Sequence, residues 1–230
     1  MSKKMMLLAL SVVSAVLFAL PAVASATPAH ISATEPFTVA KGLVSEKGIL
    51  ETTGGEKIEC LKGVSGEGSW HSTTTGTLTL EFHECTAPTI FGNLTCTTRT
   101  SEGGTNPESA GTIRTTNLEF HMIMIAANTP GVLITPDTAT NVFAHFTCGG
   151  GLVTKTVVGN GVIGTITSPA CSTPSTTATL KFEQGATTGL QKHTTYTGVN
   201  YHLESPAGTK ASQTAEGRII FKENKSIICT

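Results

Sequence analysis

The sequence predicts an all-β protein: a β-sandwich or a barrel-like pair of antiparallel sheets, stabilised by disulfides, after an N-terminal signal helix. Three observations support this fold class. Short runs of β-branched and apolar residues are separated by Gly, Pro and Asn, as in all-β chains. Helical periodicity is scarce beyond the N-terminus. Six cysteines follow the N-terminal segment, and an even number in an exported chain favours disulfides.

The N-terminus has the three parts of a secretory signal peptide. Lys3 and Lys4 form a basic start, residues 5–20 carry no charge, and small residues end at Ala26. We therefore expect residues 1–26 to be a signal peptide that is cleaved after Ala26. The uncharged run is too short for a comfortable membrane span. Later apolar stretches such as MIMIAANTPGVLI are interrupted by Asn128 and Pro130, so we also expect no span in the mature chain. The sequence predicts a bacterial protein that is secreted, either extracellular or at the cell surface.

Charge and composition exclude several classes of partner. Without Lys3 and Lys4, the 15 basic residues become 13 against 16 acidic ones, and there is one Trp and two Tyr. Nucleic-acid binding needs basic patches, usually with aromatic platforms, so we predict no nucleic-acid partner. A single Asp excludes Asp-rich calcium loops.

The chain after the signal peptide is long enough for one core. All-β chains of this size commonly form one domain, so we predict a single β domain over residues 37–230. Residues 27–36 are predicted to be a poorly ordered leader. The stretch SPACSTPSTT, residues 168–177, is the best candidate for an internal loop or a seam between sub-domains.

Two strands have the clearest patterns. Thr77–His83 alternates, with Leu78, Leu80 and Phe82 on one face, which predicts a half-buried strand. Leu118–Ile125 becomes apolar on both faces in its second half, which predicts a central strand. Further strands are expected over residues 37–44, 57–61, 112–114, 132–134, 141–148, 152–158, 162–167, 178–182, 194–203, 218–222 and 226–229.

The six cysteines allow fifteen pairings, so the connectivity stays open. Cys85 and Cys96 flank TAPTIFGNLT, which we interpret as an inter-strand loop. Closing that loop would stabilise the fold by about 3 kcal/mol on the chain-entropy model, so we predict a Cys85–Cys96 disulfide. The remaining pairs would then be Cys60–Cys148 and Cys171–Cys229.

The tetrapeptide Leu-Glu-Phe-His occurs at residues 80–83 and again at residues 118–121. Glu81 and His83 share one face of a predicted strand, and so do Glu119 and His121. If the two strands were adjacent with matching register, these four side chains could converge on a metal ion, with His145 as a further candidate ligand. The favoured interpretation is simpler: each strand places Leu and Phe inward and Glu and His outward.

Other catalytic and cofactor motifs are either absent from the sequence or lack the structural context that they need. Residues 159–164 match G-x-G-x-x-G, but a dinucleotide site needs a helix there, and the following TITSPAC is β-branched and broken by Pro. We therefore predict a hairpin turn at this position and no cofactor. No G-x-S-x-G nucleophile elbow occurs, which weighs against a hydrolase.

Trp70, the only Trp, lies in the Gly-rich stretch SGEGSWHSTTTG. An exposed loop Trp can stack on a sugar ring or a partner. The favoured alternative is an aromatic ring folded back onto the end of the sandwich, because large aromatics contribute strongly to core burial.

In the order of several short features, the chain resembles a family of exported, cysteine-containing, β-rich proteins of soil actinobacteria. These features are KIEC, GTLTLEFHECT followed by Cys96, AGTIRTTNLEF, VGNGVIGTIT and TLKFEQG. The family has no known activity or cofactor, so the resemblance implies export and a β architecture only. Its members often have a small residue where His83 and His121 stand here, which speaks against a site built on these two residues.

These observations favour a secreted protein without catalytic activity that acts as a structural or binding module, with a cell-envelope component or a glycan as partner. One alternative is an extracellular metal-dependent or hydrolytic enzyme that uses the strand His and Glu residues. The other is a glycan-binding module that uses the Trp70 loop.

Overall fold

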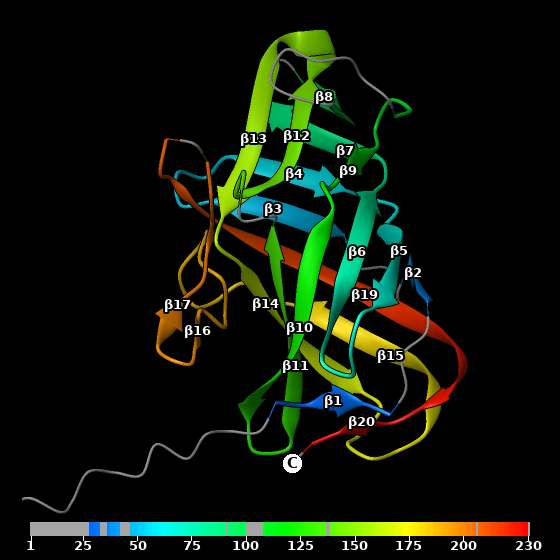
Figure 1. The fold of residues 1–230 in the computed structure, drawn as a ribbon. Helices are drawn as coiled ribbons and strands as arrows, with labels where there is room; N and C mark the ends of the chain where they lie inside the picture. The colour runs from blue at the N-terminus through cyan, green and yellow to red at the C-terminus, as the bar shows by residue number, and fades with distance from the viewer. Residues whose placement is uncertain are drawn as a thin grey trace, which may run out of the picture.

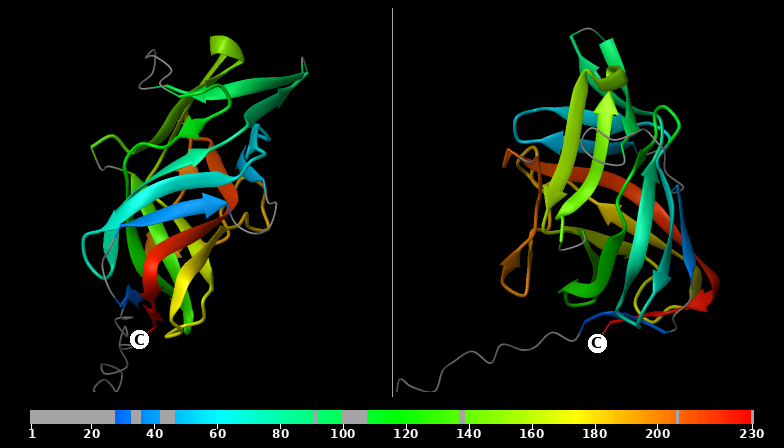
Figure 2. Two further views of the ribbon diagram at one scale, coloured as in Figure 1. Left: turned by 90° about the vertical axis from the view of Figure 1, so that its right-hand side faces the viewer. Right: turned by 45° about the horizontal axis from the view of Figure 1, so that its top comes forward.

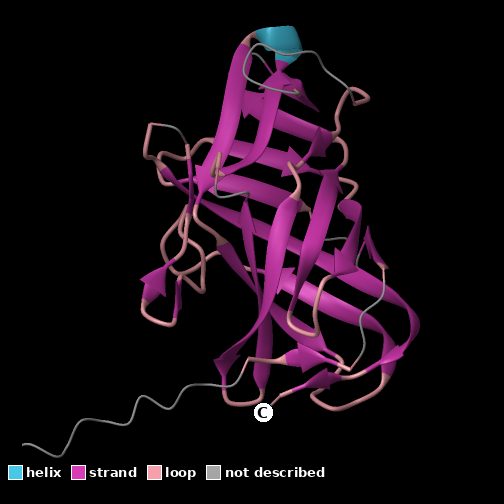
Figure 3. Ribbon diagram, viewed as in Figure 1, coloured by secondary structure: helices cyan, strands magenta, loops and turns pink. Residues whose placement is uncertain are grey.

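The computed structural model describes residues 28–32, 36–41, 47–90, 92–99, 108–136, 139–205 and 207–229. The predicted signal peptide and its cleavage site at Ala26 lie outside the described residues. Within the described residues, all regular elements are strands except one short 3-10 turn, η2 (Gly149–Gly151) (Figure 3). The predicted all-β class is therefore confirmed.

Eight strands close into an antiparallel barrel (Figure 1). Each strand pairs with the next one of the set along the chain, and the last pairs with the first. Of the two predicted architectures, the barrel is the one that forms. Its strands are β2 (Phe37–Lys41), β5 (Val64–Trp70), β6 (Thr75–Phe82), β10 (Leu118–Ala126), β11 (Thr129–Pro136), β14 (Val162–Ser168), β15 (Ser175–Phe182) and β19 (Lys210–Lys225).

Alternate connections of the barrel extend at one end into hairpins, which form a second circuit of antiparallel pairs above the barrel (Figure 2). The second circuit shares β19 with the barrel, because the first residues of this long strand pair with β3 and β18 and the later ones with β2 and β15. Its other strands are β3 (Gly48–Thr52), β4 (Lys57–Cys60), β7 (Cys85–Thr89), β8 (Gly92–Thr98), β12 (Val142–Cys148), β13 (Val153–Gly159) and β18 (Leu203–Glu204).

The opposite end of the barrel is covered by β1 (His30–Ile31) and β20 (Ile227–Ile228), which pair with each other and which we call the cap (Figure 1). The Ile31 amide donates to the Thr73 carbonyl in the β5–β6 turn, and the Ser172 amide donates to the Ile227 carbonyl. The prediction of a poorly ordered leader is therefore wrong for residues 28–32. The physical reason is burial, since Ala29 and Ile31 are almost fully removed from solvent.

The three disulfides are Cys60–Cys85, Cys96–Cys148 and Cys171–Cys229. The last confirms the prediction, whereas the predicted Cys85–Cys96 and Cys60–Cys148 pairs are wrong. TAPTIFGNLT is a hairpin of two strands and not a loop, and its strands have different outer neighbours. Cys85 bonds to Cys60 on β4, and Cys96 bonds to Cys148 on β12. In both pairs the two cysteines are directly opposite each other in the strand register.

Two Gly- or Pro-rich stretches connect strands. Residues 168–177 contain the turn between β14 and β15, which pair with each other. Residues 159–164 join β13 to β14 with no helix, but the predicted hairpin is wrong because these strands pair with different neighbours. At Gly159 (φ 148°), an added Cβ would collide with the His202 carbonyl, so glycine lets β18 approach closely.

The second half of β10 is covered on both faces, as predicted for a central strand. Met122 belongs to the main core, whereas Ile123 packs on the outer side with Leu133 and Ile163. Tyr196 and Tyr201 pack against this outer cluster. They come from the region of the short hairpin formed by β16 (Thr195–Tyr196) and β17 (Val199–Asn200).

Candidate functional site

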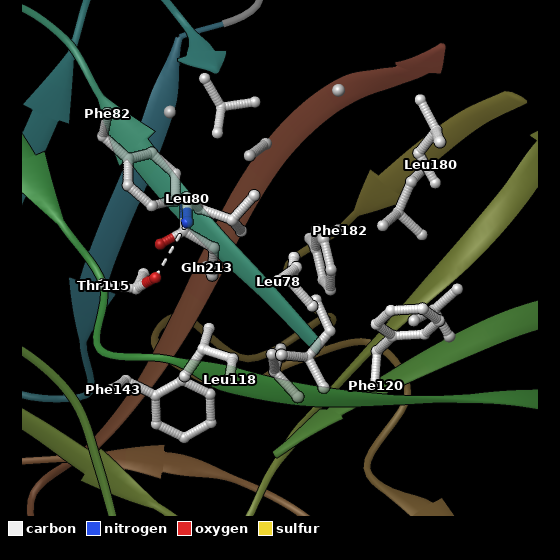
Figure 4. Close-up of a pocket in the computed structure, with 18 of the residues that line it drawn as sticks. Leu78, Leu80, Phe82, Thr115, Leu118, Phe120, Phe143, Leu180, Phe182 and Gln213 are labelled. Atoms are coloured by element: carbon white, nitrogen blue, oxygen red, sulfur yellow. Dashed lines mark hydrogen bonds between the residues drawn. The ribbon is translucent and has the colours of Figure 1, made fainter. Parts of the chain in front are cut away.

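A cavity of about 130 Å³ lies within the core (Figure 4). Its walls come from the barrel, for example Leu118, from the second circuit, for example Phe146, and from the cap, through Ile31 and Ile227. Most of these side chains belong to the single main cluster of buried apolar residues. The cavity is therefore an unfilled part of the protein's main core.

Strand alternation directs the apolar side chains into this cavity. Leu78, Leu80 and Phe82 of β6 all line it, as their spacing in the sequence predicts. Leu118 and Phe120 do the same on the neighbouring β10. An eight-stranded barrel has an interior that side chains nearly fill, or that holds one small ligand. In this protein, side chains fill most of the interior, and the cavity that remains is large enough for one small ligand only.

Three aromatic rings pack together beside the cavity. The Trp70 ring meets the Phe120 ring edge to face, with centroids 4.6 Å apart, and Phe37 lies 5.7 Å from Trp70 and 5.6 Å from Phe120. Glycines on the facing strands make room, because an added Cβ at Gly68 would collide with Phe37 and one at Gly76 would lie 2.6 Å from Phe120. Trp70 ends a strand and lines the cavity, so its placement agrees with the ring-folded-back interpretation.

Two polar side chains, Thr115 and Gln213, interrupt the apolar lining, and Figure 4 shows both. Thr115 Oγ1 accepts a hydrogen bond from the Leu80 amide at 3.0 Å. Gln213 Nε2 donates to the Thr214 carbonyl at 3.2 Å. In the described part of the chain, Gln213 Oε1 has no hydrogen-bond partner. The lining thus offers an apolar volume with a small number of polar atoms, which is the usual composition of a ligand pocket.

The candidate metal ligands do not converge. The strands that carry the two Leu-Glu-Phe-His copies are adjacent, but the antiparallel register places His121 opposite Thr75 and Glu119 opposite Thr77. His83 follows the far end of β6. Across the described ranges, no group of three or more His, Cys, Asp or Glu side chains could hold a metal ion. His145, the third candidate, hydrogen-bonds Thr156 Oγ1 through Nδ1 at 2.9 Å.

His83 instead belongs to a polar array on the protein surface. Its Nε2 is 2.7 Å from Ser65 Oγ and 4.0 Å from Glu81 Oε2, and Arg114 Nε lies 3.8 Å from Glu81 Oε1. A nucleophile beside a base is one part of a hydrolytic site. A triad, however, needs the carboxylate on the other ring nitrogen, and here Glu81 and Ser65 approach the same one. None of these four residues lines the cavity.

A shallower depression of about 490 Å³ lies on the barrel near β2, β5 and β6. Its rim is polar, with Thr38, Glu67 and Thr79. The aromatic residues beside it, Phe37 and Phe221, are buried. It therefore lacks the exposed aromatic platform on which a sugar ring stacks.

Sequence reasoning missed Gln213 and Thr115. The signal for Gln213 is present in KASQTAEGRIIF, where Ala211, Gln213, Ala215 and Ile219 share one face of an alternating strand. The strand prediction began only at Arg218, so this face was not recognised. Thr115 carries no such signal, because it follows the two-residue strand β9 (Ile113–Arg114).

Comparison with protein-family models, curated proteins and solved structures finds no match to this chain. Within the residues that the structure describes, no helix is long and apolar enough to cross a membrane.

Proposed function

We propose that this protein is a non-catalytic binding protein that holds one small apolar molecule inside its barrel. The observation that carries the proposal is the cavity in the main core, whose walls are apolar apart from Thr115 and Gln213. This function narrows the sequence-based prediction of a structural or binding module to the binding of a small ligand, and the closed barrel would enclose that ligand.

The size of the cavity limits the ligand. Pockets for drug-sized molecules are roughly 300–1,000 Å³, whereas this cavity measures about 130 Å³. An apolar cavity of roughly 150 Å³ in an engineered protein stays dry and binds benzene or xenon. The ligand is therefore the size of one aromatic ring or a short alkyl chain.

Leaving such a cavity empty is unfavourable. At the cost observed for cavities left by large-to-small substitutions, 130 Å³ corresponds to about 3 kcal/mol of lost stability. Water can be held only beside Thr115 and Gln213, because a buried water needs two to four polar partners and the rest of the lining is apolar. A small apolar molecule would restore the missing contacts.

We further propose that the protein acts outside the cell. Support comes from the signal-peptide pattern of the N-terminus and from the three disulfides, which persist mainly in oxidising compartments. The test is mass spectrometry of the secreted protein from its bacterial host, which should begin at Thr27. A protein retained in the cytosol with an intact N-terminus would contradict this part.

The binding proposal is tested with benzene. Trp70 is the only Trp and lines the cavity, so its fluorescence reports on occupancy, with calorimetry giving the stoichiometry. We expect saturable binding of one benzene per chain and a higher unfolding temperature. The variant Ala178→Leu, which adds volume at a buried lining residue, should lose binding. The matched control Ala207→Leu, at an exposed position, should retain it.

Wild-type protein that neither binds benzene nor gains stability from it would overturn the proposal. Equal binding by the wild type and a folded Ala178→Leu variant would also overturn it, because the ligand would then occupy another site. If Ala178→Leu does not fold, the wild-type titration alone decides.

A second candidate function is hydrolysis at Ser65, favoured by its 2.7 Å contact with His83. It predicts turnover of an activated ester that disappears in Ser65→Ala. Equal background rates in the two proteins would eliminate it.

A further inference from the structure

We propose that the cavity selects a small apolar molecule carrying one hydroxyl group, and that the Gln213 amide recognises this hydroxyl. The inference rests on the proposed function and names the ligand class more narrowly. The observation behind it is a single polar side chain, Gln213, on an otherwise apolar face of β19.

Gln213 interrupts an otherwise apolar face. The neighbours that share its face of β19 are Ala211, Ala215, Gly217, Ile219 and Phe221, and the last four also line the cavity. An amide directed toward such surroundings costs free energy unless its polar atoms are paired. Gln213 itself is only partly buried, so this cost applies to the part of its amide that faces the cavity.

The backbone around Gln213 does not explain the side chain. At this point β19 changes partners, since β18 pairs with it at Ala211 and β15 begins to pair at Ala215. The buried Gln191 side chain fills the gap: its Oε1 accepts from the Gln213 amide at 2.9 Å and its Nε2 donates to the Gln213 carbonyl at 3.0 Å. Both backbone groups of Gln213 are thus satisfied without the Gln213 side chain.

The Gln213 side chain has unused hydrogen-bonding capacity. A glutamine amide can donate two hydrogen bonds and accept two. The side-chain amide of Gln213 makes one contact within the described residues, from Nε2 to the Thr214 carbonyl at 3.2 Å. Its Oε1 has no partner there, and one N–H is also free. Gln191 holds the backbone at Gln213, so the point from which this side chain extends is fixed.

Thr115 supplies a second polar atom to the lining. Its Oγ1 already accepts from the Leu80 amide, and its hydroxyl hydrogen makes no hydrogen bond within the described chain. The cavity therefore offers an acceptor at Gln213 and donors at both residues, all uncharged. A neutral hydroxyl, which both donates and accepts, fits this set, whereas a carboxylate or an ammonium group would bring an unpaired charge into apolar walls.

The experiment compares phenol with benzene, a pair that differs by one hydroxyl. Calorimetry on the full mature chain should show that wild-type protein binds both. Gln213→Met removes the amide and keeps an unbranched side chain of similar length. It should weaken phenol binding about ten-fold, as expected for loss of one buried hydrogen bond, and change benzene binding less than about two-fold.

A second measurement does not depend on the variant. In wild-type protein, the Gln213 side-chain NH₂ signals in NMR should shift when phenol binds and shift much less with toluene, which replaces the hydroxyl by a methyl group. Phenol should also bind at least as tightly as toluene, although toluene is the more apolar molecule.

The possible failures are distinguishable. If benzene binds but phenol binds no better in the wild type than in Gln213→Met, the hydroxyl inference is wrong and the proposed function stands. Unchanged NMR chemical shifts of the Gln213 side-chain NH₂ group at saturating phenol would also overturn the hydroxyl inference. If neither benzene nor phenol binds, both the proposed function and the inference fail.

Discussion

His121 lies on β10 and His83 directly follows the neighbouring antiparallel strand β6, but the two residues lie far apart along this pair of strands. His121 of β10 is directly opposite Thr75 of β6, and His83 comes eight positions after Thr75 along β6 and its extension. With a rise of about 3.4 Å per residue, the two histidines are separated by about 27 Å. The repeated tetrapeptide therefore marks two paired strands whose His side chains cannot share a ligand.

This separation predicts independent energetic effects. In urea unfolding, the destabilisations caused by His83→Ala and His121→Ala should add within about 0.5 kcal/mol in the double variant. The positive control is Ser65→Ala combined with His83→Ala, because these side chains are 2.7 Å apart and should couple. Strong coupling between the two histidines would contradict the register of β6 and β10.

Gly76 should not tolerate a side chain. A Cβ at this position would lie 2.6 Å from the Phe120 ring and would collide with the Ser69 carbonyl, so Gly76→Ala forces the aromatic cluster or the β5–β6 pair to move. We expect a loss of about 1–3 kcal/mol. Gly54→Ala is the matched control, since the nearest atom would be Thr52 Oγ1 at 3.7 Å, and its effect should stay within about 0.5 kcal/mol. Equal effects would argue against the close approach at Gly76.

The Cys171–Cys229 disulfide should stabilise the cap end of the barrel. It links the β14–β15 turn to the residue after β20 across a sequence separation of 58. On the chain-entropy model, replacing both cysteines with Ser should lower the free energy of unfolding by up to about 4 kcal/mol. Peptide mapping of the variant must still show Cys60–Cys85 and Cys96–Cys148. An unchanged urea midpoint with these two bridges intact would be incompatible with this role.

Glu183 should make stability depend on pH in the acid range. The hydrogen bond from Lys192 Nζ, at 2.7 Å, lowers the pKa of Glu183 below its ordinary value of 4.5. As pH falls, the unfolded chain takes up this proton before the folded protein does. The stabilisation is therefore complete above the unfolded pKa and is lost as pH falls through the folded one. The effect should be small, because the Glu183 side chain is 32 % exposed.

The measurement is the urea midpoint of wild type and Glu183→Gln at pH 6 and at pH 3. The variant should lose less stability on acidification than the wild type. Lys192→Met is the matched second variant, because it removes the hydrogen bond to Glu183, and it should show the same reduced loss of stability on acidification. Identical acid dependence in wild type and Glu183→Gln would show that the Lys192 contact does not shift the titration.

The sequence predicted well where structure follows from neighbouring residues. The alternation of Leu78, Leu80 and Phe82 correctly identified the face that lines the core, because side-chain direction in a strand reverses at every residue. The doubly apolar pattern around Ile123 correctly indicated a strand covered on both faces. By contrast, the Gly-rich stretch that contains Gly66 and Gly68 was interpreted as a loop, although it is strand β5. These glycines are selected by the rings and backbone that press on them, which a propensity scale does not include.

Disulfide formation was predictable in kind, but of the three pairs only Cys171–Cys229 was predicted correctly. Cys85 and Cys96 flank one hairpin and are close along the chain, which made their pairing attractive on entropic grounds. Each cysteine instead bonds to a strand on its other side, Cys60 or Cys148. Strand order across the second circuit decided this, and strand order depends on contacts between distant segments.

By itself, the sequence determined the all-β class, the inward faces of its best-patterned strands and the presence of a disulfide framework, because these follow from local alternation and composition. Only the tertiary structure decided the rest: that the sheet closes into a barrel, that His83 and His121 are separated, that His30 and Ile31 form part of a cap, and that Gln213 faces an apolar cavity. Each of these depends on which distant strands become neighbours and in which register, and closure of the barrel sets both at once.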